Sequence, residues 1–463
     1  MTAVTTAAAL TSTEVRRALA VWLPRQRWFA GTGSPLADVS VTAVHRFTTD
    51  TQGAAPFGAF VLVRARDSAG TDAASHLVPL GLDGTAPGCD DAAVVATVGN
   101  LTVYDALQDP RLVNALIRHT THGLDLDGVR YRTEAPGCTP PAGDLPVRPL
   151  GAEQSNSSVV AGEQYILKVF RRLGTGPSPD LMLHRMLRDA GSAHVTPLIG
   201  AVEDSGTGTT YATLQRFLPQ ATDGWAAALT AVSALRENPA GGDFTAQAQS
   251  LGRAVAAVHR DLARAAGETM LRPEDYRRLS RTFLQRLERS LALAERLAPY
   301  RSRLRAVFTA VAALEPAPHS VAHLTHGDLH LGQTLRTAEG WLLLDFEGEP
   351  LASDAERARR HSPLRDVAGM LRSFDYAAHH GLVGTAAQGE AEGARSWAAG
   401  NRQAFLEGYV AGGGRAVTDC LTLLRAYELD KAVYEVLYET QHRPSWAWIP
   451  LRALERDLSP GLV

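Results

Sequence analysis

Alternation of apolar and polar positions dominates the first half of the chain, and helical periodicity dominates the second half. A short amphipathic helix is expected from Ser12 or Thr13 to Leu23. Three alternating segments then predict strands of a small antiparallel sheet. They cover Val39 to Val44, Gly58 to Arg66 and Ser75 to Leu82. The stretch from Gly81 to Asp91 predicts a loop, and a helix from Asp109 to Thr120 comes after it.

A proline-rich connection from Ala135 to Pro149 predicts a boundary. A hairpin and a third strand are expected at Val147 to Leu150, Ser158 to Ala161 and Tyr165 to Phe170. A helix from Pro179 to Ala190 is expected to follow them. Two further strands, Val195 to Val202 and Tyr211 to Phe217, complete this strand-rich region.

The remaining chain has a helical period. The helices expected there run from Phe244 to Ala265, Pro273 to Leu297, Tyr300 to Leu314, Ser362 to Tyr376 and Asp419 to Gln441. In the first of them, His259 lies beside an apolar stripe and is interpreted as structural. The second carries arginines that we interpret as a solvated face rather than a binding patch. These are Arg277, Arg278, Arg281, Arg286 and Arg289.

Candidate chemistry is concentrated in the run from His326 to Glu349. Asp328 is followed five positions later by Gln333, and twelve positions beyond that by Asp345 at the end of an apolar strand. Phosphoryl transfer to a hydroxyl needs a carboxylate that receives the proton, and two oxygen ligands for the Mg²⁺ that bridges the nucleotide phosphates. Turn aspartates beside buried strands are common, but their combination with the amide and the strand favours a kinase.

Protein kinases place these three groups in the same order. This chain departs from them in carrying Gln333 where an asparagine is usual, and Phe346-Glu347 after Asp345 where Phe-Gly is usual. Asp366 suits the first turn of its expected helix, or alternatively braces the catalytic loop.

A candidate nucleotide site lies in the strand-rich region. Lys168 interrupts an apolar strand, where a lysine is either an edge residue or a phosphate ligand. The preceding loop is rich in side chains and backbone amides that can cover an anion, which favours the phosphate role. Its candidate residues are Gln154, Ser155, Asn156 and Ser157. The segment from Leu214 to Leu218, with Gln215 and Phe217, is the expected hinge that pairs with adenine.

The carboxylate that pairs with Lys168 is left open by the sequence. Kinases place a glutamate on the helix that follows this strand, but Met182 occupies the equivalent face. Asp180, Glu153 or no residue at all are the alternatives.

The last long helix carries an unusually polar tyrosine stripe. Tyr427, Lys431, Tyr434 and Tyr438 fall on one helical face. Such a stripe either packs into the core or lines a sugar site, because aromatic faces stack on sugar rings. Spacing alone does not separate the two interpretations.

Composition and charge narrow the class of protein. With 463 residues and 45% hydrophobic content, the chain can hold two or three domains. A net charge of −3 gives no electrostatic case for nucleic acid or an anionic membrane as partner. The three cysteines form no C-x-x-C pair, which argues against a disulfide framework or a zinc site. We therefore expect a cytoplasmic protein without an export signal or a membrane span.

Several stretches resemble the bacterial maltokinases, which make maltose 1-phosphate from ATP and maltose. The matching stretches are Trp22 to Gly31, Leu150 to Asn156, Ile166 to Arg172, His326 to Glu349, Ser362 to Phe374 and Ala426 to Tyr434. The resemblance implies an α+β, two-lobed fold like that of eukaryotic protein kinases, with a small β-rich N-lobe and a helical C-lobe. It also implies an N-terminal α+β cap domain. The implied ranges are 1–95 for the cap, 96–217 for the N-lobe and 218–463 for the C-lobe.

The same resemblance implies roles for individual residues. Asp328 is the expected catalytic base, Gln333 and Asp345 are expected Mg²⁺ ligands with Glu347 as an addition, and Lys168 is the expected phosphate clamp. The expected acceptor residues are His326, Arg372, Tyr376, Glu428, Lys431, Tyr434 and Tyr438. The implied product feeds α-glucan synthesis from trehalose, with trehalose synthase as a partner.

Two other functions stay open at this point. A kinase of the same fold for another sugar or an amino sugar, such as glucosamine, would want a carboxylate near the ammonium group, from Glu428 or Asp430. The other hypothesis is a catalytically silent partner of trehalose synthase, and the intact Asp328, Gln333 and Asp345 argue against it. The oligomeric state, the nucleotide preference and the role of the cap are not set by the sequence.

Overall fold

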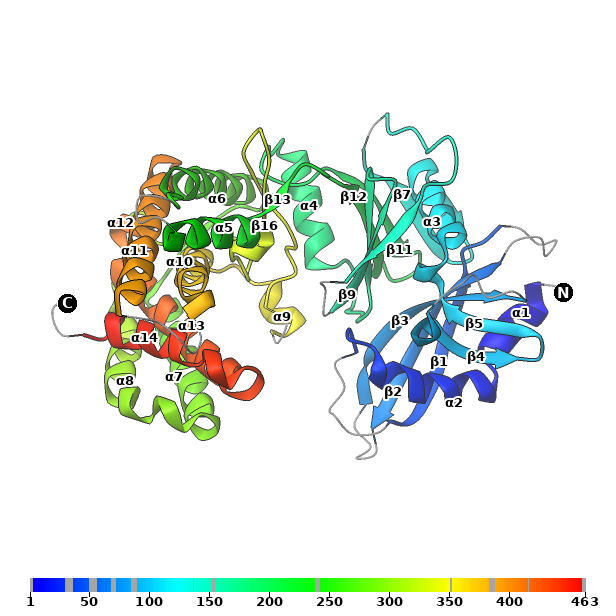
Figure 1. Cartoon of the computed structure of the whole chain (residues 1–463), viewed down its shortest axis with the longest axis horizontal. Helices are drawn as coiled ribbons and strands as arrows, with labels where there is room; N and C mark the ends of the chain where they lie inside the picture. Colours follow the sequence, from blue (N-terminus) through cyan, green and yellow to red (C-terminus); the bar gives the residue numbers. More distant parts are fainter. Residues whose placement is uncertain are drawn as a thin grey trace. The chain divides into compact units, whose positions relative to one another are not determined.

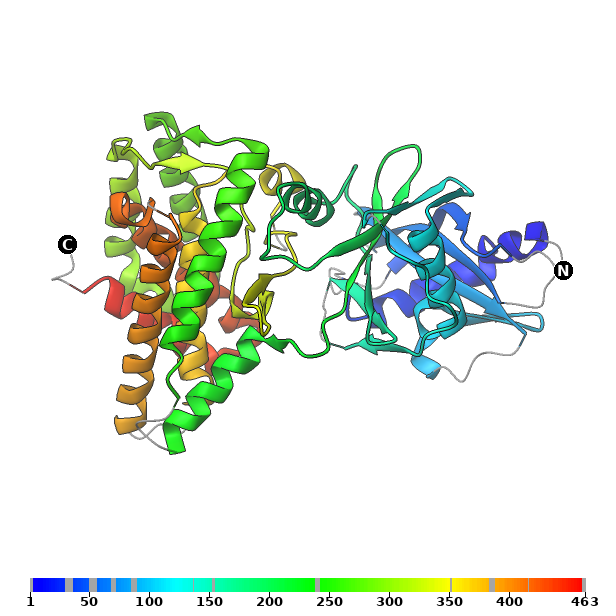
Figure 2. The ribbon, with the colours of Figure 1, turned by 90° about the horizontal axis from the view of Figure 1, so that it is seen from above.

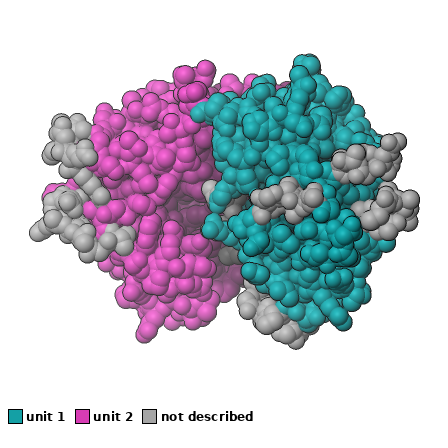
Figure 3. All heavy atoms as spheres, turned by 45° about the vertical axis from the view of Figure 1, so that its right-hand side comes forward, with its two compact units in different colours: residues 1–182, 196–219 teal, residues 183–195, 220–463 magenta. Residues whose placement is uncertain are grey.

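The computed structural model describes most of the chain as two compact units. The described residues are 3–29, 36–49, 56–67, 72–84, 90–135, 137–151, 155–237, 242–349, 352–382, 388–414 and 416–459. The first unit comprises Met1–Met182 and Thr196–Pro219, and the second comprises Leu183–Val195 and Gln220–Val463 (Figure 3). Within the described ranges, no helix is both long and apolar enough to cross a bilayer.

The first unit begins with a five-stranded antiparallel sheet in the order β1-β2-β3-β5-β4 (Figure 1). Its strands are β1 (Leu36–Arg46), β2 (Phe57–Asp67), β3 (Asp72–Asp83), β4 (Val94–Val98) and β5 (Leu101–Asp105). The helix α2 (Thr13–Trp22), preceded by α1 (Ala3–Leu10), buries Val15, Leu19 and Trp22 against this sheet. Ser12 caps α2, since its hydroxyl accepts a hydrogen bond from the Val15 N–H at 3.2 Å.

A seven-stranded sheet forms the rest of the first unit, in the order β6-β7-β11-β12-β10-β9-β8. Its strands are β6 (Leu124–Leu126), β7 (Val129–Thr133), β8 (Val147–Leu150), β9 (Asn156–Ala161), β10 (Tyr165–Phe170), β11 (Leu198–Asp204) and β12 (Thr210–Arg216). The helix α3 (Pro110–His122) packs on β7 and β11. The helix α4 (Pro179–Asp189) follows β10 and passes into the second unit.

The two sheets of the first unit are joined through the segment that follows β10. The Leu77 N–H of β3 donates to the Arg171 carbonyl at 2.8 Å, and the Leu173 N–H donates to the Ser75 carbonyl at 2.8 Å. Side chains of both sheets, including Phe60 and Leu167, share one hydrophobic cluster. The strand that carries Lys168 is therefore continuous with the packing of the first sheet.

The second unit is mainly helical (Figure 2). Its helices are α5 (Gly224–Glu237), α6 (Thr245–Ala266), α7 (Pro273–Leu293), α8 (Arg301–Ala310), α9 (Asp354–Arg357), α10 (Leu364–His379), α11 (Gln388–Ala411), α12 (Ala416–Asp419), α13 (Leu421–His442) and α14 (Trp448–Asp457). Short strands pair as β13-β16-β17 and as β14-β15. Their bounds are Thr222–Asp223, Thr334–Arg336 and Trp341–Leu343, then Thr269–Met270 and Val321–Ala322.

Glycines allow α6 and α11 to lie side by side (Figure 2). A Cβ on Gly252 would stand 2.1 Å from the Phe405 carbonyl oxygen, and one on Gly408 would stand 1.9 Å from the Gln249 carbonyl oxygen. No real Cβ reaches such distances, so any larger residue would push the helices apart. This contact supports the core on which α10 and α13 are packed.

Most predicted elements are present, and several elements were missed. The expected strands and helices coincide with α2, β1 to β3, α3, β8 to β12, α4, α6 to α8, β17, α10 and α13 within a few residues. The loop predicted from Gly81 was wrong at its start because β3 continues to Asp83, and residues 85–89 lie outside the described ranges. The missed helices and strands are α1, α5, α9, α11, α12, α14, β4 to β7 and β13 to β16.

Candidate active site

The loop from His326 to Asp328 is held by Asp366, in the first turn of α10. The Asp366 carboxylate accepts the His326 N–H at 2.8 Å and the Gly327 N–H at 2.9 Å. It also contacts His259 Nε2 at 3.0 Å, and His259 Nδ1 lies 2.8 Å from the Tyr409 hydroxyl. Although burial raises the pKa of Asp366, these partners lower it well below its usual range. Asp366 therefore braces the loop, as one of the two sequence interpretations held, and His259 is structural.

His326 connects this loop to the end of the strand that carries Asp345. The His326 Nδ1 accepts the Asp328 N–H at 3.4 Å, which leaves the ring proton on Nε2, 2.7 Å from the Leu344 carbonyl oxygen. The ring also packs on Phe346 at 4.8 Å between centroids. Only 1% of the His326 surface is exposed, so its ring supports the loop from the protein interior.

Gln333, Asp345 and Glu347 form a group of oxygen-bearing side chains. The Gln333 Nε2 donates to Asp345 Oδ2 at 3.1 Å, and ligand atoms of Asp345 and Glu347 lie within 4.8 Å of each other. Asp345 has φ of +59°, a left-handed conformation that is uncommon for a residue other than glycine. Carboxylate and amide oxygens are the donors that hard divalent cations take, so this group fits such a cation.

Asp328 forms an ion pair with Lys431 of α13. The Lys431 Nζ donates to Asp328 Oδ1 at 2.9 Å and to Glu349 Oε1 at 3.5 Å. Burial raises the pKa of Asp328, but the positive charge of Lys431 and the neighbouring histidines outweigh it and lower the pKa to about 2. Asp328 is therefore ionised across the physiological pH range and is held against a cation.

A hollow of about 50 Å³ lies next to Asp328 within the second unit. A group of charged side chains surrounds it, which we call the cavity cluster: Arg286, Asp328, Glu349, Glu356, Arg365, Asp430 and Lys431. Arg286 pairs with Asp430 at 2.7 Å, and Arg365 pairs with Glu349 at 3.3 Å. Burial raises the pKa of Asp430 to about 6, with Arg286 opposing the rise.

Sequence reasoning misjudged Arg286 and overlooked most of the cavity cluster. Arg277, Arg278, Arg281 and Arg289 are exposed as expected, but the Arg286 side chain is only 23% exposed and faces the hollow. Arg286 lies three positions after the buried Phe283, at the edge of the apolar face of α7. Its place at the edge of this apolar face was the one feature of the sequence that could have indicated that Arg286 is partly buried. Glu349 and Arg365 gave no such signal, because their contacts join segments that are distant in the sequence.

Lys168 of the first unit pairs with Asp180. The Lys168 Nζ donates to Asp180 Oδ2 at 3.3 Å, and both side chains are buried. Asp180 lies at the start of α4, two positions before Met182. The question left open by the sequence is thus answered: an aspartate in the first turn contacts the lysine.

The other predicted nucleotide residues lie on neighbouring strands. In the register of β9 and β10, Ser158 is opposite Lys168 and Asn156 is opposite Phe170. The Asn156 Nδ2 donates to the Ser155 hydroxyl at 3.4 Å, and Ser157 accepts the Arg171 Nε–H at 2.8 Å.

The expected hinge follows the end of β12. The Thr196 hydroxyl donates to Gln215 Oε1 at 2.9 Å, and the Phe217 N–H donates to the Gln164 carbonyl at 2.8 Å. Gln154 lies outside the described residues, as does Glu153.

The predicted acceptor residues on α13 fall into separate environments. Tyr434 stacks on Tyr438 at 6.3 Å between centroids, and the Lys431 ammonium lies 5.5 Å from the Tyr434 ring. Tyr427 is buried against Phe283. The tyrosine stripe is thus partly core, at Tyr427, and partly an aromatic face beside Lys431.

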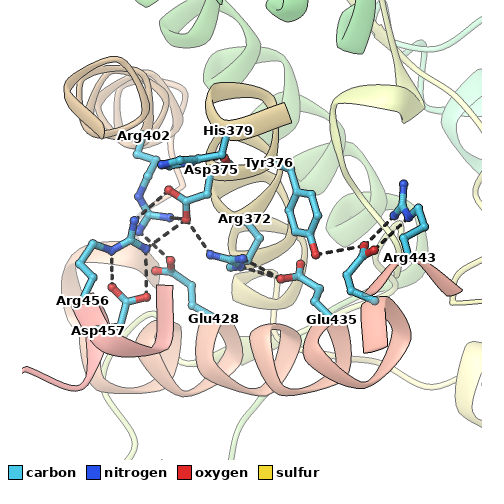
Figure 4. A network of polar contacts seen from close by, with 11 residues as sticks. Arg372, Asp375, Tyr376, His379, Arg402, Glu428, Glu435, Arg443, Arg456 and Asp457 are labelled. Atoms are coloured by element: carbon cyan, nitrogen blue, oxygen red, sulfur yellow. Dashed lines mark hydrogen bonds and ion pairs between the residues drawn. The ribbon is translucent and has the colours of Figure 1, made fainter. Parts of the chain in front are cut away.

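Arg372, Tyr376 and Glu428 lie in a different environment (Figure 4). Arg372 is 1% exposed and pairs with Glu435 and Asp375, each at 2.7 Å. Glu428 pairs with Arg402 at 2.7 Å, and the Tyr376 hydroxyl donates to Glu439 at 3.3 Å. We call the linked ion pairs the Arg372 network: Arg372, Asp375, Arg402, Glu428, Glu435 and Arg456.

Comparison with known families agrees with this arrangement of loops and strands. The phosphotransferase enzyme family, APH, matches residues 146–401, which is more than half of the chain. The chain belongs to this phosphotransferase family. A second match, the maltokinase N-terminal cap domain, covers residues 22–109 of the phosphotransferase. The predicted α+β kinase-like fold with an N-terminal cap is therefore confirmed.

Two curated relatives of the phosphotransferase are glucosamine kinases. The protein from Streptacidiphilus jiangxiensis is 29% identical over 369 residues, covering 75% of this chain and 80% of the relative. The protein from Mycolicibacterium smegmatis (strain ATCC 700084 / mc(2)155) is 28% identical over 331 residues, covering 68% of this chain and 80% of the relative.

Solved structures of glucosamine kinase share the fold of the phosphotransferase. One, in complex with glucosamine, ADP and inorganic phosphate, matches with a TM-score of 0.67 and 24% identity over 91% of this chain and 94% of that one. Crystal form A matches with a TM-score of 0.68 and 23% identity over 90% and 92%. At this identity the likeness concerns the fold alone.

Proposed function

We propose that the protein phosphorylates maltose at its anomeric hydroxyl, with ATP as phosphoryl donor and maltose 1-phosphate as product. The observation that carries the choice of a neutral acceptor is the position of Lys431, whose ammonium lies 2.9 Å from the carboxylate of Asp328. The match of residues 22–109 to the maltokinase cap domain supports maltose as that acceptor.

In this proposal Asp328 orients the acceptor hydroxyl and receives its proton. The hydroxyl oxygen forms a bond with the γ-phosphorus, the bond between that phosphorus and the bridging oxygen breaks, and ADP leaves. Because the pKa of Asp328 is lowered to about 2, the carboxylate is ready to accept the hydroxyl hydrogen bond at any physiological pH. The ion pair with Lys431 and the loop brace from Asp366 hold it in place.

The charge next to Asp328 argues against an amino sugar. An ammonium group on the acceptor would have to approach Asp328 where Lys431 already places a cation, and like charges repel. Glu428, one of the carboxylates considered for such an acceptor, is 7% exposed and paired with Arg402. Tyr434 and Tyr438, stacked beside Lys431, offer a face on which an uncharged sugar ring can pack.

For the nucleotide, we propose phosphate ligands from the first unit and metal ligands from the second unit. Lys168 would contact the phosphates, oriented by Asp180 at 3.3 Å. Ser155, Asn156 and Ser157 would cover the phosphates with backbone and side-chain donors. Gln333, Asp345 and Glu347 would hold Mg²⁺, which when bound offsets the negative charge of the phosphates.

A second candidate is the phosphorylation of glucosamine. The relatives at 28% and 29% identity carry that name, and so do the solved structures that share the fold. This candidate requires a carboxylate for the substrate ammonium, and Asp430 in the cavity cluster is the remaining one of the two considered from the sequence.

An assay of ADP release with maltose, glucose, glucosamine and trehalose tests the proposal. We expect the highest kcat/KM with maltose, and phosphorus NMR of the product should show an anomeric phosphate. Trehalose has no free anomeric hydroxyl and serves as the matched negative substrate. A kcat/KM that is higher with glucosamine than with maltose would contradict the proposal and favour glucosamine as the acceptor.

The three-domain division, the cytoplasmic location and trehalose synthase as a partner stay predictions.

A further inference from the structure

Two polar atoms in the wall of the hollow beside Asp328 have no hydrogen-bond partner among the described residues. They are the Tyr427 hydroxyl and the Oδ1 atom of Asp430. Tyr427 is 7% exposed and Asp430 is 5% exposed. A buried polar group without a partner is costly, so native proteins satisfy such groups with water or with a ligand.

These atoms lie on the side of α13 that carries Lys431. Tyr427, Asp430 and Lys431 are at positions i, i+3 and i+4 of the helix, which places them next to one another on its surface. Lys431 pairs with Asp328, so the hollow adjoins the carboxylate proposed as base. A volume of about 50 Å³ accommodates roughly four water molecules.

The two atoms without a partner favour an occupant rich in hydroxyl groups. The three cations that line the hollow, Arg286, Arg365 and Lys431, are each already paired with a carboxylate. A hydroxyl group both donates and accepts hydrogen bonds, so it can satisfy both kinds of atom. The Tyr427 hydroxyl can do either, and the Asp430 carboxylate accepts.

We infer that this hollow is a subsite for acceptor hydroxyl groups next to the one that is phosphorylated, and that Tyr427 and Asp430 bind them. The inference rests on the proposed sugar kinase activity and adds residues outside the Tyr434 and Tyr438 face. In the free enzyme, water molecules occupy the hollow. When the acceptor binds, its hydroxyls replace that water and reach Tyr427 and Asp430.

Tyr427→Phe is the sharpest test, because the hydroxyl it removes has no partner in the protein. The variant should keep the stability of the wild type, since no hydrogen bond within the protein is lost. The acceptor KM should rise roughly 3- to 10-fold, as expected for one hydrogen bond between uncharged groups, with the ATP KM unchanged. Tyr131→Phe is the matched control, because it also removes a buried hydroxyl without a partner, but in the first unit.

Asp430→Asn should have the larger effect, roughly 10- to 100-fold on the acceptor KM, because the hydrogen bond involves a charged group. A panel of monodeoxy acceptors then identifies the hydroxyl involved. Removing that hydroxyl should weaken the wild type but should leave Tyr427→Phe or Asp430→Asn unaffected, since the contact is already lost.

The outcomes separate this inference from the proposed function. A wild-type enzyme that phosphorylates no sugar in the panel would overturn the proposed function and this inference with it. An active wild type, with both variants within twofold of its acceptor KM, would overturn only the inference. A Tyr131→Phe control that matched Tyr427→Phe in acceptor KM would also overturn it.

Discussion

The second unit holds two groups of buried charges that differ in how completely they are paired. In the Arg372 network, Arg372 contacts Glu435 and Asp375, and none of the six described side chains has a buried polar atom without a hydrogen-bond partner. In the cavity cluster, Asp430 keeps one oxygen without a partner and the hollow adjoins Asp328. Burial of charge is thus common to both groups, and they differ in that the cavity cluster has an oxygen without a partner beside a hollow.

Asp328→Asn should produce the largest effect in the cavity cluster. Loss of the proton acceptor should lower kcat about 10²- to 10⁴-fold, the usual range for general-base assistance. The ATP KM should change little, because Asp328 is not among the proposed nucleotide residues. Steady-state kinetics with circular dichroism as a folding check would measure both, and a variant with near wild-type turnover would remove Asp328 from the mechanism.

Arg372→Leu should affect stability rather than catalysis. Removing the guanidinium leaves Glu435 and Asp375 without one of their partners, and breaking a buried pair in this way costs about 3–5 kcal/mol. Urea unfolding should show this loss, whereas kcat per folded molecule should stay close to that of the wild type.

Arg281→Leu, on the exposed face of α7, is the matched control and should change stability by about 0.5 kcal/mol or less. An Arg372→Leu variant that kept wild-type stability but had a raised acceptor KM would show that Arg372 is not a structural residue. It would support the role in the acceptor site that the sequence predicted for Arg372.

Asp430→Asn should give a smaller, pH-dependent change in stability. Burial raises the pKa of Asp430 to about 6, from the ordinary value near 4 for an aspartate. As pH rises from 4 to 7, the unfolded chain loses this proton before the folded protein does, so the contribution of Asp430 to stability falls. At about 1.4 kcal/mol per pKa unit, the wild type should lose up to about 3 kcal/mol relative to Asp430→Asn over that range.

Urea unfolding of both proteins at pH 4, 5, 6 and 7 would measure this difference. The charged groups that set the pKa of Asp430 are Arg286, Glu349, Arg365 and Lys431. A stability difference that stays constant from pH 4 to 7 would show that Asp430 does not change its protonation state on folding over that range, and would contradict the prediction.

The parts of the site that follow one another along the chain could be predicted from the sequence. Asp328, Gln333 and Asp345 form a motif within one short segment, and the apolar strand before Asp345 fixes where the segment ends. Lys168 was recognisable because a lysine in an apolar strand is unusual. Its partner could not be chosen from the sequence, because positions 180 and 182 lie about 200° apart around the helix and the pattern does not show which of them faces Lys168.

Contacts between distant segments could not be predicted. Arg286 of α7 and Asp430 of α13 are separated by 144 positions, and neither helix pattern shows that the two meet. Arg372 and Glu428 looked like polar residues available to a sugar, because Glu435 and Arg402, which pair with them, come from other helices. The helix α11 was missed because its alanines and glycines form no apolar stripe, although its glycines are what allow the close contact with α6.

The hydrogen bonds of His326 make the proposed base and the proposed metal ligand parts of a single rigid piece. One ring nitrogen holds the backbone of Asp328 and the other holds the carbonyl of Leu344, one residue before Asp345. A displacement of either carboxylate therefore carries the other along. A movement that separated the two carboxylates within the second unit would have to break at least one of these two hydrogen bonds.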